Sequence, residues 1–397
     1  MEVRPGYKQT EVGVIPDDWS VKSVGDVCQI LGRIGFRGYT VNDIVKRGQG
    51  AIAISPSNIK DGKMNFADCT YISWLKYEES PEIKLCKGDI LLVKTGSTFG
   101  KTAIIQQLDE KATLNPQLVV LKKVRTSNVF LSYMMGFSTI QNQISEFVVG
   151  GALPTLSQRL VANFKIPVPN SDTEQRAIAT ALSDVDALLA KLDQFIAKKY
   201  DLKQAAMQRL LTGQTRLPGF SGEWEVKRLG DITKLYQPVT ISAKQFTESG
   251  YPVYGANGVV GFYAEFNHEA SQVTVTCRGS TCGTINQTVE KSWITGNAMV
   301  VNCDHSSNLN KDFLYYLLLG QDLSVCITGT GQPQIVRGPL ANFELPIPRN
   351  VDEQTAIADI LCDMDVEIAA LEARRDKTRA LKQGMMQELL TGRIRLI

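Results

Sequence analysis

Several short segments of this 397-residue chain hold residues that could bind a nucleotide or carry catalysis. Residues 95–102 read T-G-S-T-F-G-K-T and differ from a phosphate-binding P-loop at the first position, where that motif requires glycine. A P-loop also opens a helix, whereas the apolar residues 103–105 favour a strand. Residues 278–284 repeat the G-S-T-x-G pattern without the lysine. The pattern therefore predicts a tight loop between two strands.

Two other segments match catalytic motifs only in part. Residues 115–118 (N-P-Q-L) lack the second proline and the aromatic residue of an amino-methyltransferase motif that holds a flipped base. Residues 82–84 (E-I-K) lack the second carboxylate of a nuclease motif. Because the chain has only two histidines, general-base catalysis by histidine has few candidates. We therefore expect no catalytic residue and no enzyme activity in this chain.

The eight cysteines are irregularly spaced and form no C-x-x-C pair. A zinc site could be assembled only from residues whose spacing fits no standard motif, namely Cys277, Cys282, Cys303 and His305, so we expect no metal. The apolar runs are far shorter than the ~20 residues that span a bilayer, and the N-terminus has no apolar signal segment. These features favour the cytoplasm, where thiols stay reduced.

Polar side chains suited to reading DNA recur in the glycine-bounded loops. Basic side chains contact phosphates or guanine edges, and amides pair with adenine. The candidate DNA-binding residues are Arg33, Arg37, Lys94, Ser97, Thr98, Lys101, Asn115, Gln117, Asn257, Arg278, Ser280, Thr281, Asn297, Gln332 and Gln334. Each one taken alone is more simply a solvated loop residue. Their repeated placement in matching loops is what favours a function.

Charge is distributed unevenly along the chain, although the net charge is only +2. Residues 21–165 contain 18 Lys and Arg against 11 Asp and Glu, a net of +7. Residues 221–349 contain 9 against 11, a net of −2. The first half could supply phosphate contacts by charge alone, whereas the second would need a local basic patch.

The elements that position these loops follow from an internal repeat with an offset of 179 residues. Residues 162–217 and 341–396 are identical at 27 of 56 positions without a gap. Apolar residues recur in both copies at alternating steps of four and three, which is typical of a coiled-coil seam. The predicted seam is Ile178, Leu182, Val185, Leu189, Leu192, Ile196, Ile357, Leu361, Met364, Ile368 and Leu371. One exposed seam is costly, so we expect the two helices to pair antiparallel.

Each predicted helix has boundary signals at both ends. Asp172 and Asp352 are placed to cap the first turn, and Gly213 and Gly392 to end the last. Each helix then has about 40 residues and a length of ~60 Å. The signature W-x-V-K-x-x-G-D opens a strand-rich region before each helix. The sequence thus predicts an α+β fold with two mixed, strand-rich domains, two long antiparallel coiled-coil helices and a pseudo-two-fold repeat.

The flanks of these helices resemble those of type I restriction–modification specificity subunits. The resemblance rests on F-K-I-P-V-P and F-E-L-P-I-P before the two E-Q pairs, on the L-L-T-G endings, on the G-D openings and on G-D-I-L at 88–91. The loops at 150–154 and 329–333 are similar too. It implies an N-terminal tail and first target recognition domain at 1–168, a central conserved helix at 169–213, a second recognition domain at 214–347 and a C-terminal conserved helix at 348–397.

The resemblance also implies a function and partners. Each recognition domain would read half of a split double-stranded DNA target, and the helices would fix the half-site spacing. Two methylation subunits would carry the S-adenosylmethionine chemistry, and restriction subunits would add ATP- and Mg-dependent translocation and cleavage, so no cofactor is expected on this chain. The alternatives are a coiled-coil protein-interaction adaptor without DNA readout and an enzyme with an unrecognised site.

Overall fold

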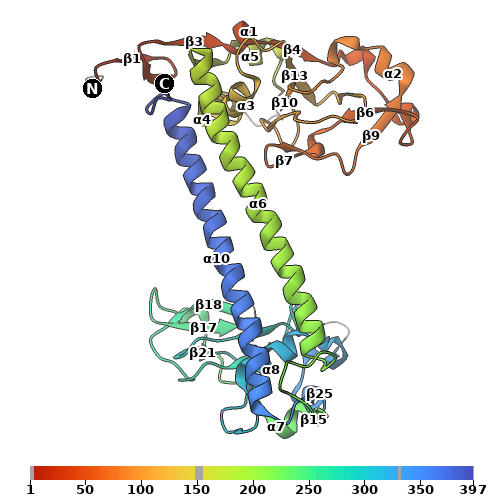
Figure 1. Cartoon of the computed structure of the whole chain (residues 1–397), viewed down its shortest axis with the longest axis vertical. Helices are drawn as coiled ribbons and strands as arrows, with labels where there is room; N and C mark the ends of the chain where they lie inside the picture. The colour runs from red at the N-terminus through yellow and green to blue at the C-terminus, as the bar shows by residue number, and fades with distance from the viewer. Residues whose placement is uncertain (1–3, 148–154, 257, 330–331, 397) are drawn as a thin grey trace. The chain divides into compact units, whose positions relative to one another are not determined.

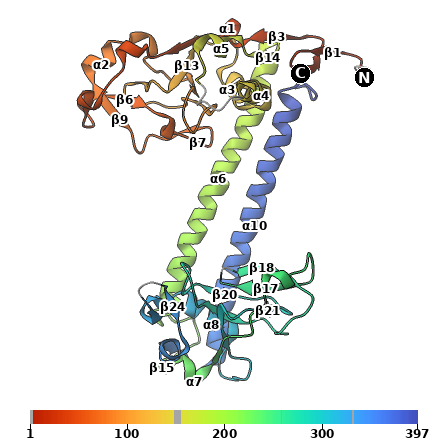
Figure 2. The same cartoon turned by 180° about the vertical axis from the view of Figure 1, so that it is seen from behind.

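The computed structural model describes residues 4–147, 155–256, 258–329 and 332–396. The chain divides into two compact units: unit 1 comprises Met1–Lys191 and Arg375–Ile397, and unit 2 comprises Leu192–Arg374. Each unit contains one strand-rich domain and part of each of two long helices, shown from opposite sides in Figures 1 and 2. No helix among the described residues is long and apolar enough to cross a membrane.

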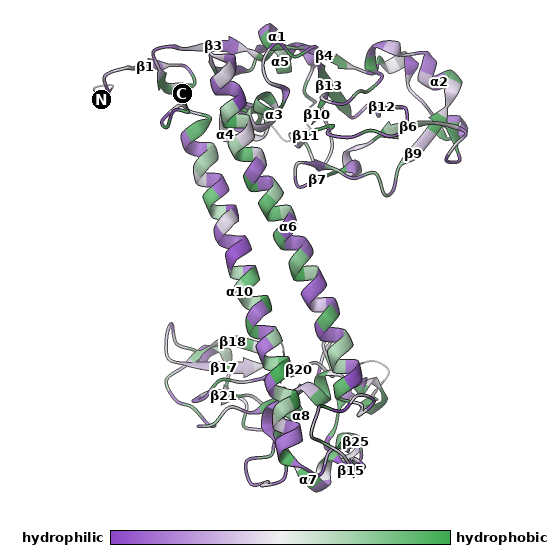
Figure 3. Cartoon of the chain, viewed as in Figure 1, coloured by the Kyte–Doolittle hydropathy of each residue, from purple (hydrophilic) through white to green (hydrophobic). Residues whose placement is uncertain are grey.

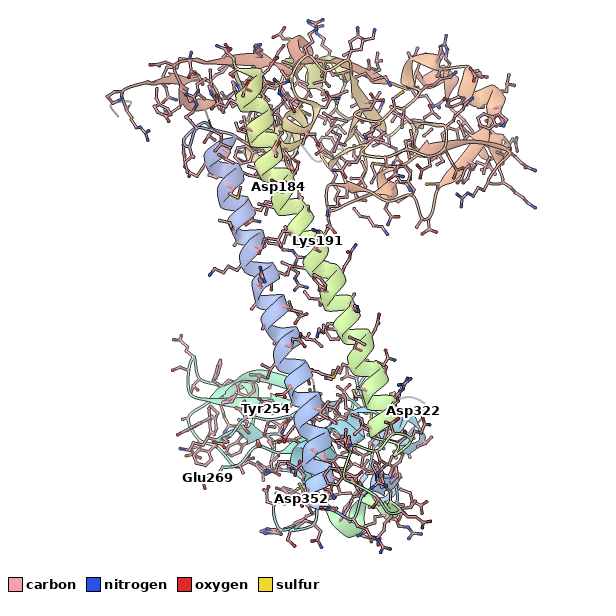
Figure 4. All side chains as sticks on the ribbon, viewed as in Figure 1. Asp184, Lys191, Tyr254, Glu269, Asp322 and Asp352 are labelled. Atoms are coloured by element: carbon pink, nitrogen blue, oxygen red, sulfur yellow. The ribbon has the colours of Figure 1, made fainter. Side chains whose placement is uncertain are left out.

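The two long helices are α6 (Asp172–Leu210) and α10 (Val351–Leu389), each with 39 residues. Ser171 Oγ accepts a hydrogen bond from the Glu174 amide at 3.4 Å, and Asn350 Oδ1 accepts one from the Asp352 amide at 2.8 Å. These two residues cap the helices, so the prediction that Asp172 and Asp352 are the caps is wrong. The aspartates lie in the first turn, where the helix dipole favours a carboxylate (Asp352 is labelled in Figure 4).

Both long helices are followed by a glycine in the left-handed conformation, as the sequence predicts. Gly213 has a φ of 70° and Gly392 a φ of 71°. A Cβ atom would also lie 3.3 Å from Trp224 at the first position and 2.6 Å from Pro16 at the second. Glycine is therefore required there both by backbone conformation and by close packing.

The predicted seam is largely buried, and apolar residues recur along both helices in Figure 3. Its buried members are Ile178, Leu182, Leu189, Leu192, Ile196, Ile357, Leu361 and Ile368. Val185, Met364 and Leu371 are half-buried. The first two seam residues of each helix belong to the core of the domain that precedes the helix. Each helix is therefore rooted in a domain core, and Met364 on α10 also packs against the core of unit 2.

An aspartate, a lysine and a tyrosine join the helices in the same way in each unit. In unit 1, Asp186 on α6 accepts hydrogen bonds from Lys382 on α10 (2.7 Å) and from Tyr133 (2.6 Å). In unit 2, Asp365 on α10 accepts them from Lys203 on α6 (2.5 Å) and from Tyr316 (2.8 Å). The start of α6 therefore lies beside the end of α10 in unit 1, and the reverse holds in unit 2. The antiparallel pairing and the internal repeat are confirmed.

The domain of unit 1 is built on two four-stranded sheets. The first has the strand order β11 (Thr102–Ile104), β10 (Ile90–Val93), β13 (Leu118–Lys122) and β4 (Gln29–Gly32), all antiparallel. The second has the order β12 (Ala112–Leu114), β6 (Gly50–Ile54), β9 (Thr70–Ser73) and β5 (Ile44–Val45), with β12 and β6 parallel. A hairpin of β7 (Ile59–Lys60) and β8 (Lys63–Met64) follows the second sheet's strand β6 in the chain.

The domain of unit 2 repeats the antiparallel sheet with different residues, and its second sheet has three strands rather than four. Its antiparallel sheet has the order β20 (Ile285–Gln287), β19 (Val273–Thr276), β22 (Ala298–Asn302) and β16 (Lys234–Tyr236). Its second sheet has the order β18 (Gly258–Tyr263), β17 (Tyr251–Gly255) and β21 (Trp293–Ile294), with β17 and β21 parallel. A short hairpin joins β23 (Ile327–Thr328) and β24 (Gln334–Ile335). The repeat therefore extends from the helices to the strand order of the antiparallel sheets and to three strands of the second sheets.

Strand pairs and short helices connect each domain to its long helix. In unit 1, β3 (Trp19–Ser23) pairs with β14 (Lys165–Pro169), and in unit 2, β15 (Glu225–Arg228) pairs with β25 (Glu344–Ile347). The W-x-V-K and F-x-x-P-x-P segments recur together because they are partner strands. The short helices are α1 (Val24–Val27), α2 (Trp74–Glu78), α3 (Asn128–Gly136), α4 (Ser138–Glu146), α5 (Gln158–Asn163), α7 (Leu229–Ile232), α8 (Lys311–Leu319) and α9 (Arg337–Ala341).

The ends of the chain meet within unit 1. The N-terminal hairpin consists of β1 (Tyr7–Thr10) and β2 (Gly13–Pro16), and the Tyr7 hydroxyl donates to the Gly392 carbonyl at 3.0 Å. The Glu174 carboxylate, 1% exposed, accepts hydrogen bonds from the Arg395 guanidinium and, at 3.2 Å, from the Trp19 indole. Arg395 also binds Asp18. The last residues of the chain thus complete the core of its first domain.

Unit 2 contains a similar contact between a buried glutamate and a distant arginine, and we call each of these contacts a clasp. Arg216, which follows α6, donates to both oxygens of Glu353 at the start of α10, at 2.5 and 2.7 Å. Its guanidinium also lies over the Trp224 ring, 5.9 Å from the centroid. The next residue, Gln354, donates to the Pro348 carbonyl at 2.9 Å and accepts from the Asn310 amide at 2.8 Å. The repeated E-Q pair therefore anchors the start of each long helix to its own unit.

The clasp yields a stability prediction. Arg395→Met leaves the buried Glu174 carboxylate without its cation, which costs about 3–5 kcal/mol in buried pairs. Arg393 lies two residues away and makes an exposed 3.6 Å ion pair with Glu388, so Arg393→Met should cost at most about 1 kcal/mol. Urea unfolding of both variants measures the difference. Equal losses of unfolding free energy would show that the clasp does not hold unit 1 together.

Candidate nucleic-acid interface

The G-S-T-x-G segment of unit 1 forms the turn between β10 and β11. The Val93 amide donates to the Lys101 carbonyl at 2.9 Å, and the Gly100 amide donates to the Val93 carbonyl at 3.0 Å. Gly96 and Gly100 have φ values of 101° and 80°, which glycine adopts without steric cost. The predicted tight loop between two strands is confirmed.

Unit 2 forms the same turn between β19 and β20. The Thr276 amide donates to the Thr284 carbonyl, and the Gly283 amide donates to the Thr276 carbonyl, both at 2.9 Å. Gly279 and Gly283 have φ values of 89° and 93°. The two turns therefore have equivalent backbone hydrogen bonds. Ser97 and Thr98 in the first turn occupy the same positions as Ser280 and Thr281 in the second.

Two further segments join each turn through backbone hydrogen bonds. In unit 1, the Lys94 amide donates to the Gln117 carbonyl (2.8 Å), and the Leu156 amide donates to the Lys94 carbonyl (2.9 Å). We call residues 94–101, 115–117 and 155–156 loop cluster 1. These bonds hold three segments that are distant in the sequence in one surface patch.

Loop cluster 2, in unit 2, consists of residues 277–284, 295–297 and 334–335. Here the Cys277 amide donates to the Asn297 carbonyl (2.9 Å), and the Ile335 amide donates to the Cys277 carbonyl (3.0 Å). Arg278 and Gln334 form an isolated antiparallel bridge. The bonds that build the two clusters are equivalent, as the strand order requires.

Most of the predicted DNA-binding residues fall in these two clusters. Cluster 1 contains Lys94, Ser97, Thr98, Lys101, Asn115 and Gln117. Cluster 2 contains Arg278, Ser280, Thr281, Asn297 and Gln334, and Gln332 is exposed two residues before Gln334. Ser97, Lys101, Gln117, Arg278, Ser280, Asn297 and Gln334 are exposed, whereas Lys94, Thr98, Asn115 and Thr281 are half-buried. Asn257, residues 150–154 and residues 330–331 lie outside the described residues.

Arg33 does not present a solvent-facing guanidinium. Its side chain is 4% exposed and donates to the Leu114 carbonyl (2.9 Å) and the Thr113 hydroxyl (3.0 Å). Burial lowers the pKa of Arg33 from its usual value. Arg37 donates to the Glu79 carbonyl at 3.0 Å. In this conformation, Arg33 supports the loop from inside, which corrects the expectation that it reaches out to DNA.

Sequence reasoning missed the segments that flank the two clusters. Asn115, predicted to pair with adenine, uses its amide nitrogen to donate to the Tyr39 hydroxyl at 2.9 Å. In unit 2, the side-chain amide nitrogen of Gln237 donates to the Gly296 carbonyl at 3.1 Å. Gln237 directly follows the edge strand β16, whereas Tyr39 lies seven residues after the edge strand β4, beyond the 3-10 turn Gly35–Arg37. Because the two residues occupy different positions, no repeated sequence signal marked these segments.

Comparison with known proteins supplies the family. A family model described as "Type I restriction modification DNA specificity domain" matches residues 16–198 and 221–378. The chain belongs to the type I restriction–modification specificity family. Among relatives, the type I restriction enzyme MjaVIII specificity subunit of Methanocaldococcus jannaschii is 23% identical over 96% of this chain and 94% of its own length. The EcoprrI specificity subunit of Escherichia coli is 28% identical over 36% of each chain.

Solved structures share the fold of this specificity subunit. The type I restriction–modification S subunit from M. genitalium has a TM-score of 0.65 at 16% identity and covers 98% of both chains. A chain from a structure described as the basis of complex assembly and conformational transition of the type I R-M system has a TM-score of 0.55 at 17% identity, over 96% of this chain and 99% of its own. The predicted family and fold class are confirmed.

The two clusters give the specificity subunit hydrogen-bonding groups suited to base edges rather than to bond cleavage. Hydroxyls and amides of Ser97, Gln117 and Asn297 can donate and accept, and Lys101 and Arg278 can meet phosphates. Cys277, Cys282 and Cys303 are free thiols, and burial raises the pKa of Cys277 and of Cys303 to about 11. Buried thiols of this kind are unreactive near neutral pH.

The contrast between Arg33 and Lys101 is testable. Arg33→Met removes charged hydrogen bonds from buried acceptors and should lower the free energy of unfolding by about 3 kcal/mol. Lys101→Met removes an exposed charge and should change it by less than about 0.5 kcal/mol. Denaturant unfolding followed by circular dichroism compares them with the unsubstituted chain. An Arg33→Met chain as stable as the Lys101→Met chain would contradict the supporting role.

Proposed function

We propose that this chain is the sequence-specific DNA-binding subunit of a type I restriction–modification complex and reads a bipartite target. The observation that carries the proposal is the duplicated loop cluster. Each recognition domain presents polar groups of the same kind on equivalent backbone hydrogen bonds. Since each cluster is built inside its own unit, each domain reads one half-site independently of the other.

Affinity for DNA need not come from this chain alone. Residues 21–165 have a net charge of +7 and residues 221–349 a net of −2. Phosphate contacts dominate the affinity of most DNA-binding proteins, and a domain with a negative net charge is a weak source of them. We therefore infer that partner subunits provide much of the backbone contact, above all near the second half-site.

The internal repeat also supports two copies of one partner. In unit 2, a groove is lined by Gln208 and Thr212 near the end of α6. In unit 1, a groove is lined by Gln387 and Thr391, the equivalent positions near the end of α10. Equivalent surfaces suit two methylation subunits, which would supply S-adenosylmethionine chemistry. Restriction subunits would supply the ATP- and Mg-dependent steps, and this chain would position both without catalysis of its own.

The test of independent reading is a domain exchange. Residues 21–165 are replaced by the corresponding segment of a family member with a different target, and the complex is reconstituted with its methylation subunits. Mapping of methylated adenines should show that one half-site changes while the other half-site and the gap stay the same. A change in both half-sites would contradict independent reading. No protected site in a footprint would instead favour the adaptor alternative.

The long helices are proposed to set the gap between half-sites. Seven residues inserted after Ala197 and seven after Leu371 add two turns to each helix and preserve the seam. The hydrogen bond between Tyr200 and Glu372 (3.3 Å) shows that these positions face each other within unit 2. At 1.5 Å per residue, the gap should lengthen by about 3 base pairs with unchanged half-sites.

A matched control distinguishes a change in half-site spacing from general disruption of the helices. Seven residues inserted after Ala197 alone shift one helix against the other, so assembly or methylation should be lost. If the paired insertion yields an active complex that methylates the original gap, the helices do not determine the spacing.

A further inference from the structure

One aliphatic side chain beside each loop cluster is unusually exposed. Val239 follows β16 in unit 2 and is 75% exposed, and Val41 follows β4 in unit 1 and is 82% exposed. Leu235 on β16, four residues before Val239, is 3% exposed, whereas Ile30 and Leu31 on β4 are half-buried. Val239 lies three residues after β16, whereas Val41 lies nine residues after β4, so the two valines are not at matching positions. Each is nevertheless an exposed aliphatic side chain near a loop cluster, and a ligand that removes it from water would gain binding energy.

The segment around Val239 is held firmly in place. The Trp293 indole donates to the Val239 carbonyl at 3.2 Å, and the Thr240 hydroxyl accepts from the Gly296 amide at 3.1 Å. A Cβ atom on Gly296 would lie 2.8 Å from the Thr240 hydroxyl, so glycine allows this close approach. Val239 is therefore displayed on an ordered backbone, which lowers the entropy lost when it meets a ligand.

This contact places Val239 beside the base-reading patch. Gly296 precedes the exposed Asn297, whose carbonyl accepts from the Cys277 amide at 2.9 Å in loop cluster 2. The neighbours of Val239 on its own loop, Gln237 and Thr240, are polar and exposed. One apolar side chain among polar ones is too small for a protein–protein patch, which usually covers several hundred Å².

Val41 lies on a loop near loop cluster 1 in unit 1. It begins a short 3-10 turn, Val41–Asp43, in which the Asp43 carboxylate accepts from the Thr40 amide at 2.8 Å. Tyr39 joins this loop to loop cluster 1 through its hydrogen bond from Asn115. Each valine thus lies on a loop that is bonded to its cluster, although the two loops differ in sequence and in their position after the edge strand.

We propose that Val239 and Val41 each read the C5-methyl group of a thymine in the major groove. This inference rests on the proposed DNA-reading function and adds a specificity residue to each half-site. Base edges in the major groove offer hydrogen-bond donors and acceptors, and the thymine methyl is their one apolar group. A valine held beside amides and hydroxyls removes that methyl from water while the polar groups bind neighbouring edges.

The experiment couples a protein methyl group to a DNA methyl group. The reconstituted complex is titrated with its target duplex and with duplexes in which each thymine in turn is replaced by deoxyuridine, which lacks only the C5-methyl. One position in the half-site read by unit 2 should bind about fourfold more weakly, the effect of about one buried methyl. With Val239→Ala, affinity for the thymine duplex should fall by a similar factor, and sensitivity at that position should disappear.

Two further variants serve as controls. Val41→Ala should act in the same way on one thymine of the other half-site and leave the first unchanged. Val226 is 67% exposed on β15, and Val226→Ala should change neither the affinity nor the sensitivity to deoxyuridine.

The outcomes distinguish this inference from the proposed function. Specific binding of a bipartite target with no change in methyl sensitivity in Val239→Ala would overturn the inference and leave the function intact. An equal loss of affinity on every duplex would also overturn it and would point to contact with a partner subunit. A wild-type complex without sequence preference would overturn the proposed function, and this inference with it.

Discussion

A buried glutamate at the start of each long helix is the constraint on which the fold depends. Glu174 and Glu353 are each 1% exposed, and an ionised carboxylate so deep in a protein needs a cation. The cation comes from a distant part of the same unit: Arg395 in unit 1 and Arg216 in unit 2. Each arginine follows the end of the other long helix, so the clasp brings one helix end to the other helix start within each unit.

The clasp, the strand pairs and the Tyr–Asp–Lys contacts all occur twice, and this duplication explains the two loop clusters. Equivalent strands lie in equivalent order, so the turns that leave them reach equivalent positions and bond to one another in the same way. The repeated residues lie at the helix ends and in the strands next to them, whereas the turn side chains contribute little to the core. The turn side chains can therefore differ between the two domains without a change in fold.

Side-chain type alone did not decide which residues near the clusters face solvent. Arg33 and Lys101 were equally good candidates in the sequence, but Arg33 is enclosed by backbone acceptors of its own domain. The reverse applies to Val239, an aliphatic residue whose side chain is 75% exposed. Both outcomes follow from the way in which separate segments pack together. Arg33 is stabilised by hydrogen bonds to the acceptors that surround it, whereas the hydrogen bonds of the Val239 loop hold the valine at the surface, away from the core.

The sequence by itself determined the internal repeat, the length of the helices, their apolar seam, the glycine stops and the turns with positive φ. These features depend on local periodicity and on backbone conformations that few residue types adopt, so short stretches of the sequence are enough to predict them. Only the tertiary structure decided the arginine partners of Glu174 and Glu353 and the assembly of each loop cluster. Those contacts join residues tens to hundreds of positions apart, and their energies depend on burial, which no local pattern encodes.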